Sequence, residues 1–275
     1  MAGNAAFIPV RENTALRGLD NLLHGELNGW FGRRAWLYHS LVWMGIIDGI
    51  TLMTILQTSR SVALSGAPRS EALTAGLMIY CVFTGIAAGI GVIITMQGAV
   101  VGEKLDGTAA WVLSKPVARP AFILAKFLGN LAGILVCMLA IPGLLAYLIL
   151  TFAANGGQWL PPPGFLAGMG ALALNLLFIE ALCLMVGALS ERRAAVIGIP
   201  LAFLIGQQFL IQSFPALENI LPWTLAVPGS GAGVSVASAL MSGQPVPSWG
   251  PVIFAGVLSI MFLLIAVWRF GKAEF

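Results

Sequence analysis

Long apolar runs alternate along the chain with short polar segments. A helix that crosses the hydrocarbon core of a bilayer needs about 20 mainly apolar residues, and six runs reach that length, at 36–57, 74–101, 126–153, 164–189, 194–214 and 250–268. Within each run the apolarity is continuous rather than alternating, and lipid requires a backbone whose hydrogen bonds are satisfied inside the segment. The pattern predicts an all-α membrane protein with six transmembrane helices.

The composition is that of a chain built for lipid. Of the 275 residues 59% are hydrophobic and only 9% are charged, whereas average soluble domains carry about 25% charged residues. Mean hydropathy is +0.93. We therefore expect residues 1–275 to form a single transmembrane domain, with the lipid bilayer as its surroundings. The net charge of +3 gives no reason to expect nucleic-acid binding.

Few side chains offer redox or metal chemistry. Cys81, Cys137 and Cys183 each fall in an apolar run and share no close spacing, so we expect small buried side chains without a disulfide or a metal site. His24 and His39 lie before the first span and at its edge, which disfavours a haem subunit, since axial ligands must lie inside the spans. No hydrolase motif accompanies them. Residues 1–35 contain no apolar run typical of a signal peptide, so no cleavage is expected.

Six spans place both termini on one side of the membrane, and the basic residues indicate which side. If that side is the inner one, the inner segments hold twelve Lys and Arg residues and the outer segments hold two. The inner set is Arg11, Arg17, Arg33, Arg34, Lys104, Lys115, Arg119, Lys126, Arg192, Arg193, Arg269 and Lys272, and the outer set is Arg60 and Arg69. This excess predicts cytoplasmic termini and a location in the cytoplasmic (inner) membrane.

Residues 14–34 precede the first span and have an amphipathic pattern. Apolar side chains recur at helical spacing, and Asn13 or Thr14 is available as an N-cap. The apolar positions are Leu16, Leu19, Leu23, Leu27 and Trp30. We predict a helix that lies on the inner membrane surface.

Residues 215–249, between the last two spans, are apolar but divided by five prolines. The pieces between the prolines are too short to cross a bilayer. Short re-entrant helices that dip into the outer leaflet fit this pattern, and a plain surface loop is the alternative.

Polar side chains inside the spans are the candidates for a translocation path. Asp48 and Glu180 lie roughly 15–18 Å deep at 1.5 Å per residue, and no Lys or Arg lies at that depth. We predict that both acids face inward and are not both ionised at neutral pH. Asn175, Gln207 and Gln208 fall at similar depth, although such side chains also serve as hydrogen-bonding links between helices. Gly85 and Gly89, Gly129 and Gly133, and Gly164 and Gly168 form small-xxx-small pairs that mark close helix packing.

Residues 102–120, between the second and third predicted spans, interrupt the apolar pattern with charges and prolines. Asp106 or Thr108 is a candidate cap for a short helix, which Pro116 ends because the residue before a proline is pushed out of the helical region. The predicted apolar face is Leu105, Ala109, Val112 and Leu113. Arg119 precedes Pro120, which suits the first turn of the next helix.

This loop resembles the cytoplasmic loop of ABC-2 type transporter permeases. That pattern has a Glu, then Gly-Thr, a short apolar helix, Ser-x-Pro-Val-x-Arg and a later Lys. The matching residues here are Glu103, Gly107, Thr108, Ser114, Pro116, Val117, Arg119 and Lys126. Ala109, Ala118 and Ala125 depart from the residues common at those positions. The layout of six spans, an N-terminal helix and a broken segment before the last span extends the resemblance to the whole chain.

The resemblance implies a permease subunit of an ABC transporter, and we expect it to be an exporter. Its loop would contain a coupling helix that docks on a separate nucleotide-binding ATPase subunit, with Asp106 added to the eight matching residues. A second permease would complete the complex. No G-x-x-x-x-G-K-[ST] occurs here, so ATP and Mg²⁺ would bind in the partner ATPase, and this chain would be neither an enzyme nor a cofactor-binding protein.

Two other functions fit the pattern without the resemblance. Asp48 and Glu180 could relay protons in a secondary transporter with its own ion coupling. The chain could also be a membrane anchor subunit of a larger complex. No residue pattern identifies a transported substrate.

Overall fold

The structure, a computed structural model, describes residues 16–66, 68, 70–229, 231 and 233–272, with all their side chains except that of Arg33. Arg11, Asn13, Thr14 and Arg69, which entered the sequence predictions, lie outside the described residues. Helices account for 82% of the structure, and none of the residues it describes lies in a β-strand. The predicted all-α class is confirmed.

Six helices are long and apolar enough to cross a membrane, as predicted. Their ranges are Ala35–Ser65, Ser70–Leu105, Arg119–Ala154, Pro162–Leu189, Arg193–Ser213 and Gly250–Gly271. The first comprises α2 (Ala35–Trp43), the π-helix η2 (Met44–Asp48) and α3 (Gly49–Ser65). The second comprises α4 (Ser70–Met96) and α5 (Val101–Leu105). Such a set of helices is that of a multi-pass membrane protein.

The third long helix comprises α7 (Arg119–Ile134), the π-helix η3 (Leu135–Ala140), α8 (Ile141–Ile149) and the π-helix η4 (Leu150–Ala154). Pro142 stands at the start of α8, directly after η3. A proline lacks an N–H and its ring crowds the carbonyl four residues earlier. A π segment widens the preceding turn and so accommodates the ring.

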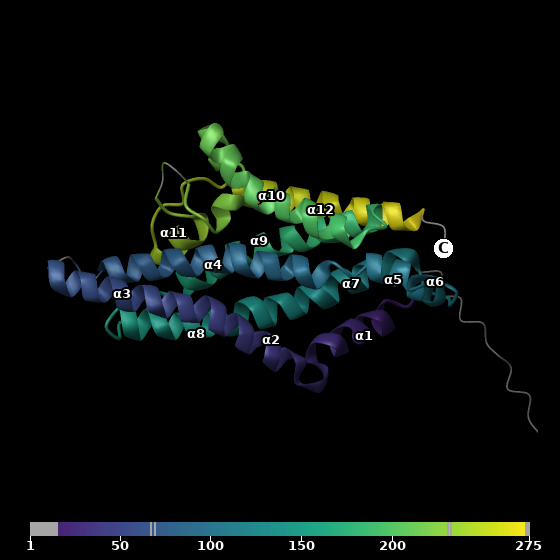
Figure 1. Cartoon of the computed structure of the whole chain (residues 1–275), viewed down its shortest axis with the longest axis horizontal. Helices are drawn as coiled ribbons and strands as arrows, with labels where there is room; N and C mark the ends of the chain where they lie inside the picture. The colour runs from purple at the N-terminus through teal and green to yellow at the C-terminus, as the bar shows by residue number, and fades with distance from the viewer. Residues whose placement is uncertain (1–15, 67, 69, 230, 232, 273–275) are drawn as a thin grey trace, which may run out of the picture.

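The long helices run side by side as an elongated bundle, with α9 (Pro162–Leu189) at its centre (Figure 1). The helices α4, α7, α10 (Arg193–Ser213), α11 (Val236–Ser242) and α12 (Gly250–Gly271) all pack against it. α9 is accordingly the most enclosed of the six. In its apolar stretch of 18 residues 72% is buried, whereas the corresponding share is 28% in α10 and in α12. We call the end of the bundle that holds α5, α6 (Thr108–Leu113) and the last turn of α12 the charged end.

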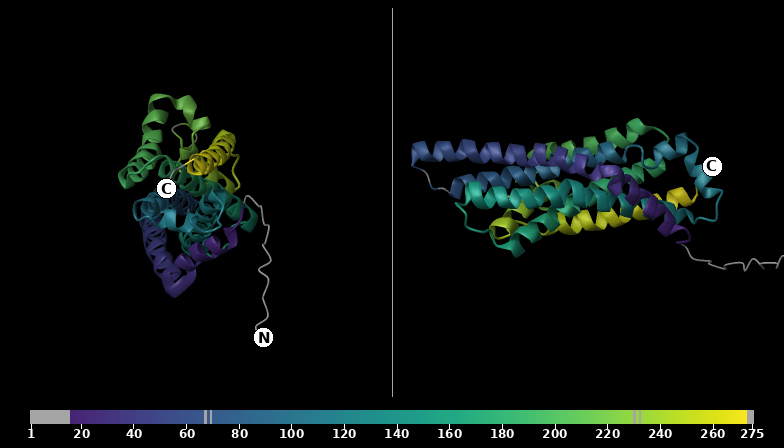
Figure 2. Two further views of the ribbon diagram at one scale, coloured as in Figure 1. Left: turned by 90° about the vertical axis from the view of Figure 1, so that its right-hand side faces the viewer. Right: turned by 90° about the horizontal axis from the view of Figure 1, so that it is seen from below.

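α1 (Leu19–Phe31) lies along α7 and is followed by a short 3-10 turn, η1 (Gly32–Arg34). It begins after Gly18, whose φ of 83° is left-handed, so neither predicted cap starts this helix. The face turned to α7 is Leu19, Leu22, Leu23, Glu26, Leu27 and Trp30. A Cβ at Gly129 or Gly133 of α7 would collide with Glu26 or Trp30. The two glycines therefore allow the close approach of α1 to α7. Figure 2 shows α1, in purple, on the outside of the bundle.

Residues 215–249 form three short helices, the 3-10 helices η5 (Pro215–Asn219) and η6 (Pro222–Leu225) and α11. α11 starts with a capping box made by Ser235 and Ser238. Its Val236, Ala237 and Met241 are fully or almost fully buried. The alternative of a plain surface loop is wrong for this part of the segment, because α11 packs into the bundle against α9 and α4.

The close packing of α11 against α9 predicts that alanine substitutions at two glycines of α9 have different effects on stability. A Cβ at Gly168 would stand 2.7 Å from the Ala237 carbonyl oxygen, whereas a Cβ at Gly170 would meet nothing within 4 Å. We expect Gly168→Ala to lower the free energy of unfolding by about 1–3 kcal/mol, because backbone must shift. Gly170→Ala should be neutral or stabilising by up to ~1 kcal/mol through helix propensity. Thermal unfolding in detergent compares them, and equal melting temperatures would contradict the tight seat.

Candidate functional site

The loop at the charged end contains two short helices rather than one. α5 ends at Leu105, and α6 starts after Gly107, whose φ of 72° is left-handed. The predicted caps are therefore wrong: Asp106 is the C-cap of α5, Thr108 is the first residue of α6, and no side chain caps α6. Glycine takes the position because a left-handed residue between two helices costs it no Cβ clash. Pro116 and Pro120 act as predicted, since α6 ends at Leu113 and α7 begins with Pro120 in its first turn.

One face of α6 packs against the bundle and the other is open. Ala109 is fully buried and Val112 and Leu113 are half-buried, as the predicted apolar face requires. Leu105 departs from that face and is 58% exposed, because the break at Gly107 turns α5 away from α6.

The open face of α6 carries a tryptophan. Trp111 is 62% exposed, and the Lys115 Nζ lies 3.4 Å from the centroid of its ring. The Ser114 hydroxyl donates to the Trp111 carbonyl oxygen over 2.7 Å and fixes the end of the helix. An exposed Trp held between a helix and a cation is a typical anchor for another protein.

Behind α6, a buried lysine joins three elements. The Lys126 side chain of α7 is 9% exposed and forms ion pairs with Glu26 of α1, over 2.6 Å, and with Glu103 of α5. Asn130, one turn along α7, donates to the Lys126 carbonyl oxygen over 2.7 Å and accepts from the Trp30 Nε1–H over 3.0 Å. We call Glu26, Glu103, Lys126, Asn130 and Trp30 the brace. It fixes both α1 and α5 to α7.

Two further contacts fix the loop to the last turns of other helices. Lys104 of α5 donates from Nζ to the carbonyl oxygens of Gly187, Ala188 and Ser190, at 2.9, 2.8 and 3.3 Å, and so caps the C-terminus of α9. Arg119 donates from Nη1 to the Gly271 carbonyl oxygen over 2.7 Å and so reaches α12. A cation at the C-terminus of a helix is favourable because the last carbonyls lack partners and carry the negative end of the dipole.

The remaining predicted loop residues have modest roles within the chain. Asp106 forms only a long, exposed pair with Arg193, at 3.8 Å. Thr108 and Pro116 are exposed. Val117 packs beside Gly18, and its neighbour Ala118 donates its N–H to the Arg17 carbonyl oxygen over 3.0 Å, so this stretch meets the start of α1.

Sequence reasoning missed two residues of the brace. Glu26 and Asn130 were not among the predicted site residues, and Lys104, outside the brace, was noted only as a basic residue. A signal was present for Glu26 and Asn130. Glu26 interrupts the apolar face of α1 seven residues after Leu19, and Asn130 follows Lys126 by one helical turn inside a predicted span. A charge on an apolar face predicts a buried partner of opposite sign.

The polar residues deep in the spans divide into braced and unpartnered groups. The Asn175 amide donates to the Gly85 carbonyl oxygen over 3.3 Å, linking α9 to α4, and the Gln207 Oε1 accepts from the Trp223 N–H over 3.0 Å, linking α10 to η6. Gln208 points to the exposed side of α10 and does not join them. The structure therefore assigns Asn175 and Gln207 to helix bracing.

Asp48 and Glu180 are the unpartnered group. Their exposed fractions are 2% and 0%, which confirms that both face the protein interior. The Asp48 carboxyl group has no hydrogen-bond partner within the part of the chain that is described, and the Glu180 carboxyl group meets only the Leu131 backbone of α7, outside standard hydrogen-bond geometry. Asp48 ends the π-helix η2, a type of segment that occurs frequently at functional sites.

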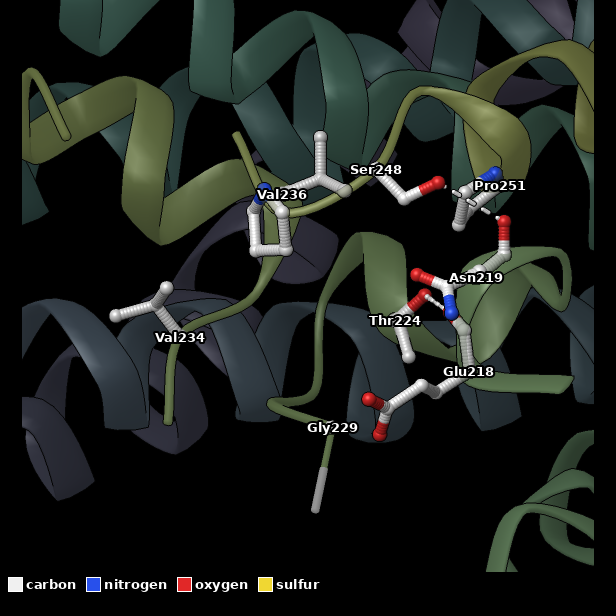
Figure 3. Close-up of a pocket in the computed structure, with 9 residues that line it drawn as sticks. Glu218, Asn219, Thr224, Gly229, Val234, Val236, Ser248 and Pro251 are labelled. Carbon is white, nitrogen blue, oxygen red and sulfur yellow. Dashed lines mark hydrogen bonds between the residues drawn. The ribbon is translucent and has the colours of Figure 1, made fainter. Parts of the chain in front are cut away.

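At the opposite end of the bundle, a small pocket lies among η5, η6 and the start of α12 (Figure 3). The Thr224 hydroxyl donates to the Glu218 carbonyl oxygen and the Ser248 hydroxyl to the Asn219 carbonyl oxygen, at 2.9 and 3.0 Å. The cavity holds about 20 Å³, which is room for roughly one water molecule. It is too small for a transported substrate and reads as a structural feature of the loop.

No group of three or more His, Cys, Asp and Glu residues able to hold a metal ion occurs among the described residues. The three cysteines are buried, as predicted, and their thiols are free. His39 packs against Trp30, with ring centroids 4.9 Å apart.

The brace predicts a ranked set of stabilities. Lys126→Met leaves two carboxylates facing each other in a nearly buried site. Loss of one partner of a buried pair costs about 3–5 kcal/mol, and since Glu26 and Glu103 are about a quarter exposed we expect roughly 2–3 kcal/mol. Glu26→Gln should cost less, because Lys126 keeps Glu103. The exposed pair offers the control: Asp106→Asn should cost under ~1 kcal/mol.

Thermal unfolding in detergent, followed by circular dichroism, measures these changes. The double variant with Glu26→Gln and Lys126→Met should be less unstable than the sum of the two single variants, with a coupling energy of about 0.5–3 kcal/mol. Strict additivity would show that the ion pair does not hold α1 on α7.

Comparison with known proteins places the chain in a family without assigning it an activity. No curated protein is similar enough to the chain to be matched. One family model, described as "Protein of unknown function (DUF2705)", matches residues 41–275. The match begins within the first span, so it includes α5, α6, Lys126 and the acids Asp48 and Glu180, and leaves out α1. Because this family model matches most of the length of the chain, the chain belongs to the DUF2705 family.

Proposed function

We propose that this chain is the permease subunit of an ATP-driven transporter of the ABC-2 type, an exporter that works with a separate ATPase. The observation that carries the proposal is the form of the loop between the second and third long helices. It presents a short helix with an exposed Trp111, and cationic side chains fix the segments on either side of that helix, α5 and the start of α7, to the bundle. A loop that only joined two helices would need neither feature.

The braced loop suggests how force would pass from the partner to the bundle. The segments that flank α6 carry these contacts: α5 reaches α9 through Lys104 and α7 through Glu103, and α7 reaches α12 through Arg119 and α1 through Lys126. A partner that grips α6 and moves would therefore displace several helices together. Glu103 and Arg119 act inside the chain in this scheme, and the exposed residues around Trp111 form the docking surface.

In this proposal the charged end faces the cytoplasm, with both termini on that side of the inner membrane. ATP and Mg²⁺ bind in the ATPase, and a second permease, identical or related, completes the transporter. α1 lies at the inner membrane surface, and η5, η6 and α11 form the re-entrant segment near the outer surface.

Trp111→Ala tests the docking surface. Removal of a central aromatic anchor commonly costs 2 kcal/mol or more of binding energy. We therefore expect about a tenfold or larger loss of ATPase recovered with the chain, and of its activity, when both are purified from native membranes. The melting temperature should stay unchanged, because the side chain is mostly exposed.

The matched control is Trp249→Ala. Trp249 is 56% exposed and precedes α12 at the opposite end of the bundle, so the ATPase should be retained. Recovery of a Walker-motif ATPase in equal stoichiometry with the wild-type chain supports the proposal. Transport by the chain alone, driven by a proton gradient, contradicts it, and a retained partner without any transport identifies an anchor subunit.

A proton-coupled secondary transporter is the second candidate, and the unpartnered carboxyl groups of Asp48 and Glu180 favour it. An ionised acid at the centre of a bilayer costs about 2.5–3.5 kcal/mol even on the lenient insertion scale. Buried acids without a partner cation are therefore retained at a cost in stability. Proton relay is one function that would require them.

Asp48→Asn and Glu180→Gln distinguish the two candidates. In the ATP-driven permease the amides should leave ATP-dependent activity within about twofold and keep or raise the melting temperature, since a neutral group costs less to bury. In a proton relay either amide should abolish gradient-driven transport while folding survives. Proteoliposomes with an imposed pH gradient, assayed with and without ATP, separate the outcomes.

A further inference from the structure

The outer face of α12 is an apolar stripe that ends in cations. The stripe residues Val257, Ile260, Met261, Leu264, Ile265 and Trp268 recur at helical spacing and are exposed or half-buried. The opposite face, with Ala255, Phe262 and Ala266, packs into the bundle. Eleven residues separate Val257 from Trp268, which is about 16 Å of helix. That length matches roughly one leaflet of a hydrocarbon core about 30 Å thick.

Two cations stand where the stripe meets the charged end. The Lys272 Nζ lies 4.3 Å from the centroid of the Trp268 ring, and Trp268 is 58% exposed. Arg269, one residue after Trp268, is exposed as well. Neither cation forms an ion pair with an acid among the described residues.

The helix dipole alone does not account for this arrangement. Cations are favourable at a helix C-terminus when they approach its last carbonyls, and Arg119 already donates to the Gly271 carbonyl oxygen. Lys272 instead lies over an aromatic ring that faces outward. Tryptophan at the edge of an apolar surface marks the level of the lipid headgroups.

We propose that this surface binds an anionic phospholipid of the adjoining leaflet, with an acyl chain along the stripe and the phosphate between Arg269 and Lys272. Arginine and lysine form strong, charge-assisted hydrogen bonds with phosphate oxygens. A second copy of the chain fits less well, because a two-fold contact along α12 with its axis along the membrane normal brings like charges together. The site is independent of any ATPase partner.

The chain contains a matched control for the cationic pair. Lys115 lies over Trp111 at 3.4 Å with the same four-residue spacing, and the two tryptophans have similar exposure. However, Lys115 follows the short helix α6, which has no long apolar stripe. Lys115→Gln therefore removes the same contact between a cation and a tryptophan, at a position that has no apolar stripe to hold an acyl chain.

The experiment measures binding of phosphatidylglycerol and of phosphatidylcholine with identical acyl chains to the full chain in detergent, by native mass spectrometry. Each basic residue near a membrane surface contributes enough for roughly a fivefold preference. Wild type should prefer phosphatidylglycerol by about 25-fold, and the variant with Arg269→Gln and Lys272→Gln by less than about twofold. Lys115→Gln should keep the wild-type preference. If the double variant is misfolded by circular dichroism, Lys272→Gln alone should lose about fivefold.

Several results would overturn the proposal. One is an unchanged lipid preference in the double variant, and another is an equal loss in Lys115→Gln. Displacement of the lipid by glycerol 3-phosphate at the same concentration would mean that the site takes free phosphate. A change in the dimer fraction with no change in lipid preference would assign the stripe to a second copy of the chain.

Discussion

The arrangement of the charged end depends on one lysine placed where lysines are costly. Lys126 is almost fully buried, about two turns into a membrane-length helix, and two glutamates from other elements face it. A buried ammonium is tolerable only with such partners. Because those partners belong to α1 and α5, its burial forces α1 against α7 and fixes the root of the loop. The glycines Gly129 and Gly133 complete the arrangement, since without side chains they let Glu26 and Trp30 come close enough to bond.

Around this lysine, the loop uses helix ends as attachment points. The last carbonyls of α9 and α12 have no partners within their own helices, and Lys104 and Arg119 supply them. The same contacts satisfy two helix ends and bind α5 and the start of α7 to two other elements. α9 is the central and most enclosed helix. A displacement of Lys104 would therefore move α9 and be transmitted to the helices that pack against it. These contacts of Lys104 and Arg119 explain how a short loop is held rigidly with Trp111 exposed.

Most of the fold could be predicted from the sequence because lipid allows few alternatives. An apolar run of 20 residues must be a helix if it crosses a bilayer, and all six runs are membrane-length helices. The local geometry of the helix starts was harder to predict. At Gly18 and Gly107 a left-handed glycine precedes the helix in place of a side-chain cap. Residue type alone does not decide between these two ways of starting a helix. The contacts of Glu26, Lys104 and Asn130 depend on which helices are neighbours, and one sequence does not give that.

The buried residues also show why polarity inside a span is an ambiguous sign of function. Asn175, Gln207, Asp48 and Glu180 looked alike in the sequence, yet the first two bond backbone groups of neighbouring helices and the acids form no hydrogen bond of standard geometry. An amide that bonds a carbonyl or an N–H contributes to packing, and its burial needs no further cause. Burying a carboxyl group without a good partner costs stability, so packing alone does not explain Asp48 and Glu180. In both transporters proposed above, the explanation would be a proton, a ligand or another conformation of the protein.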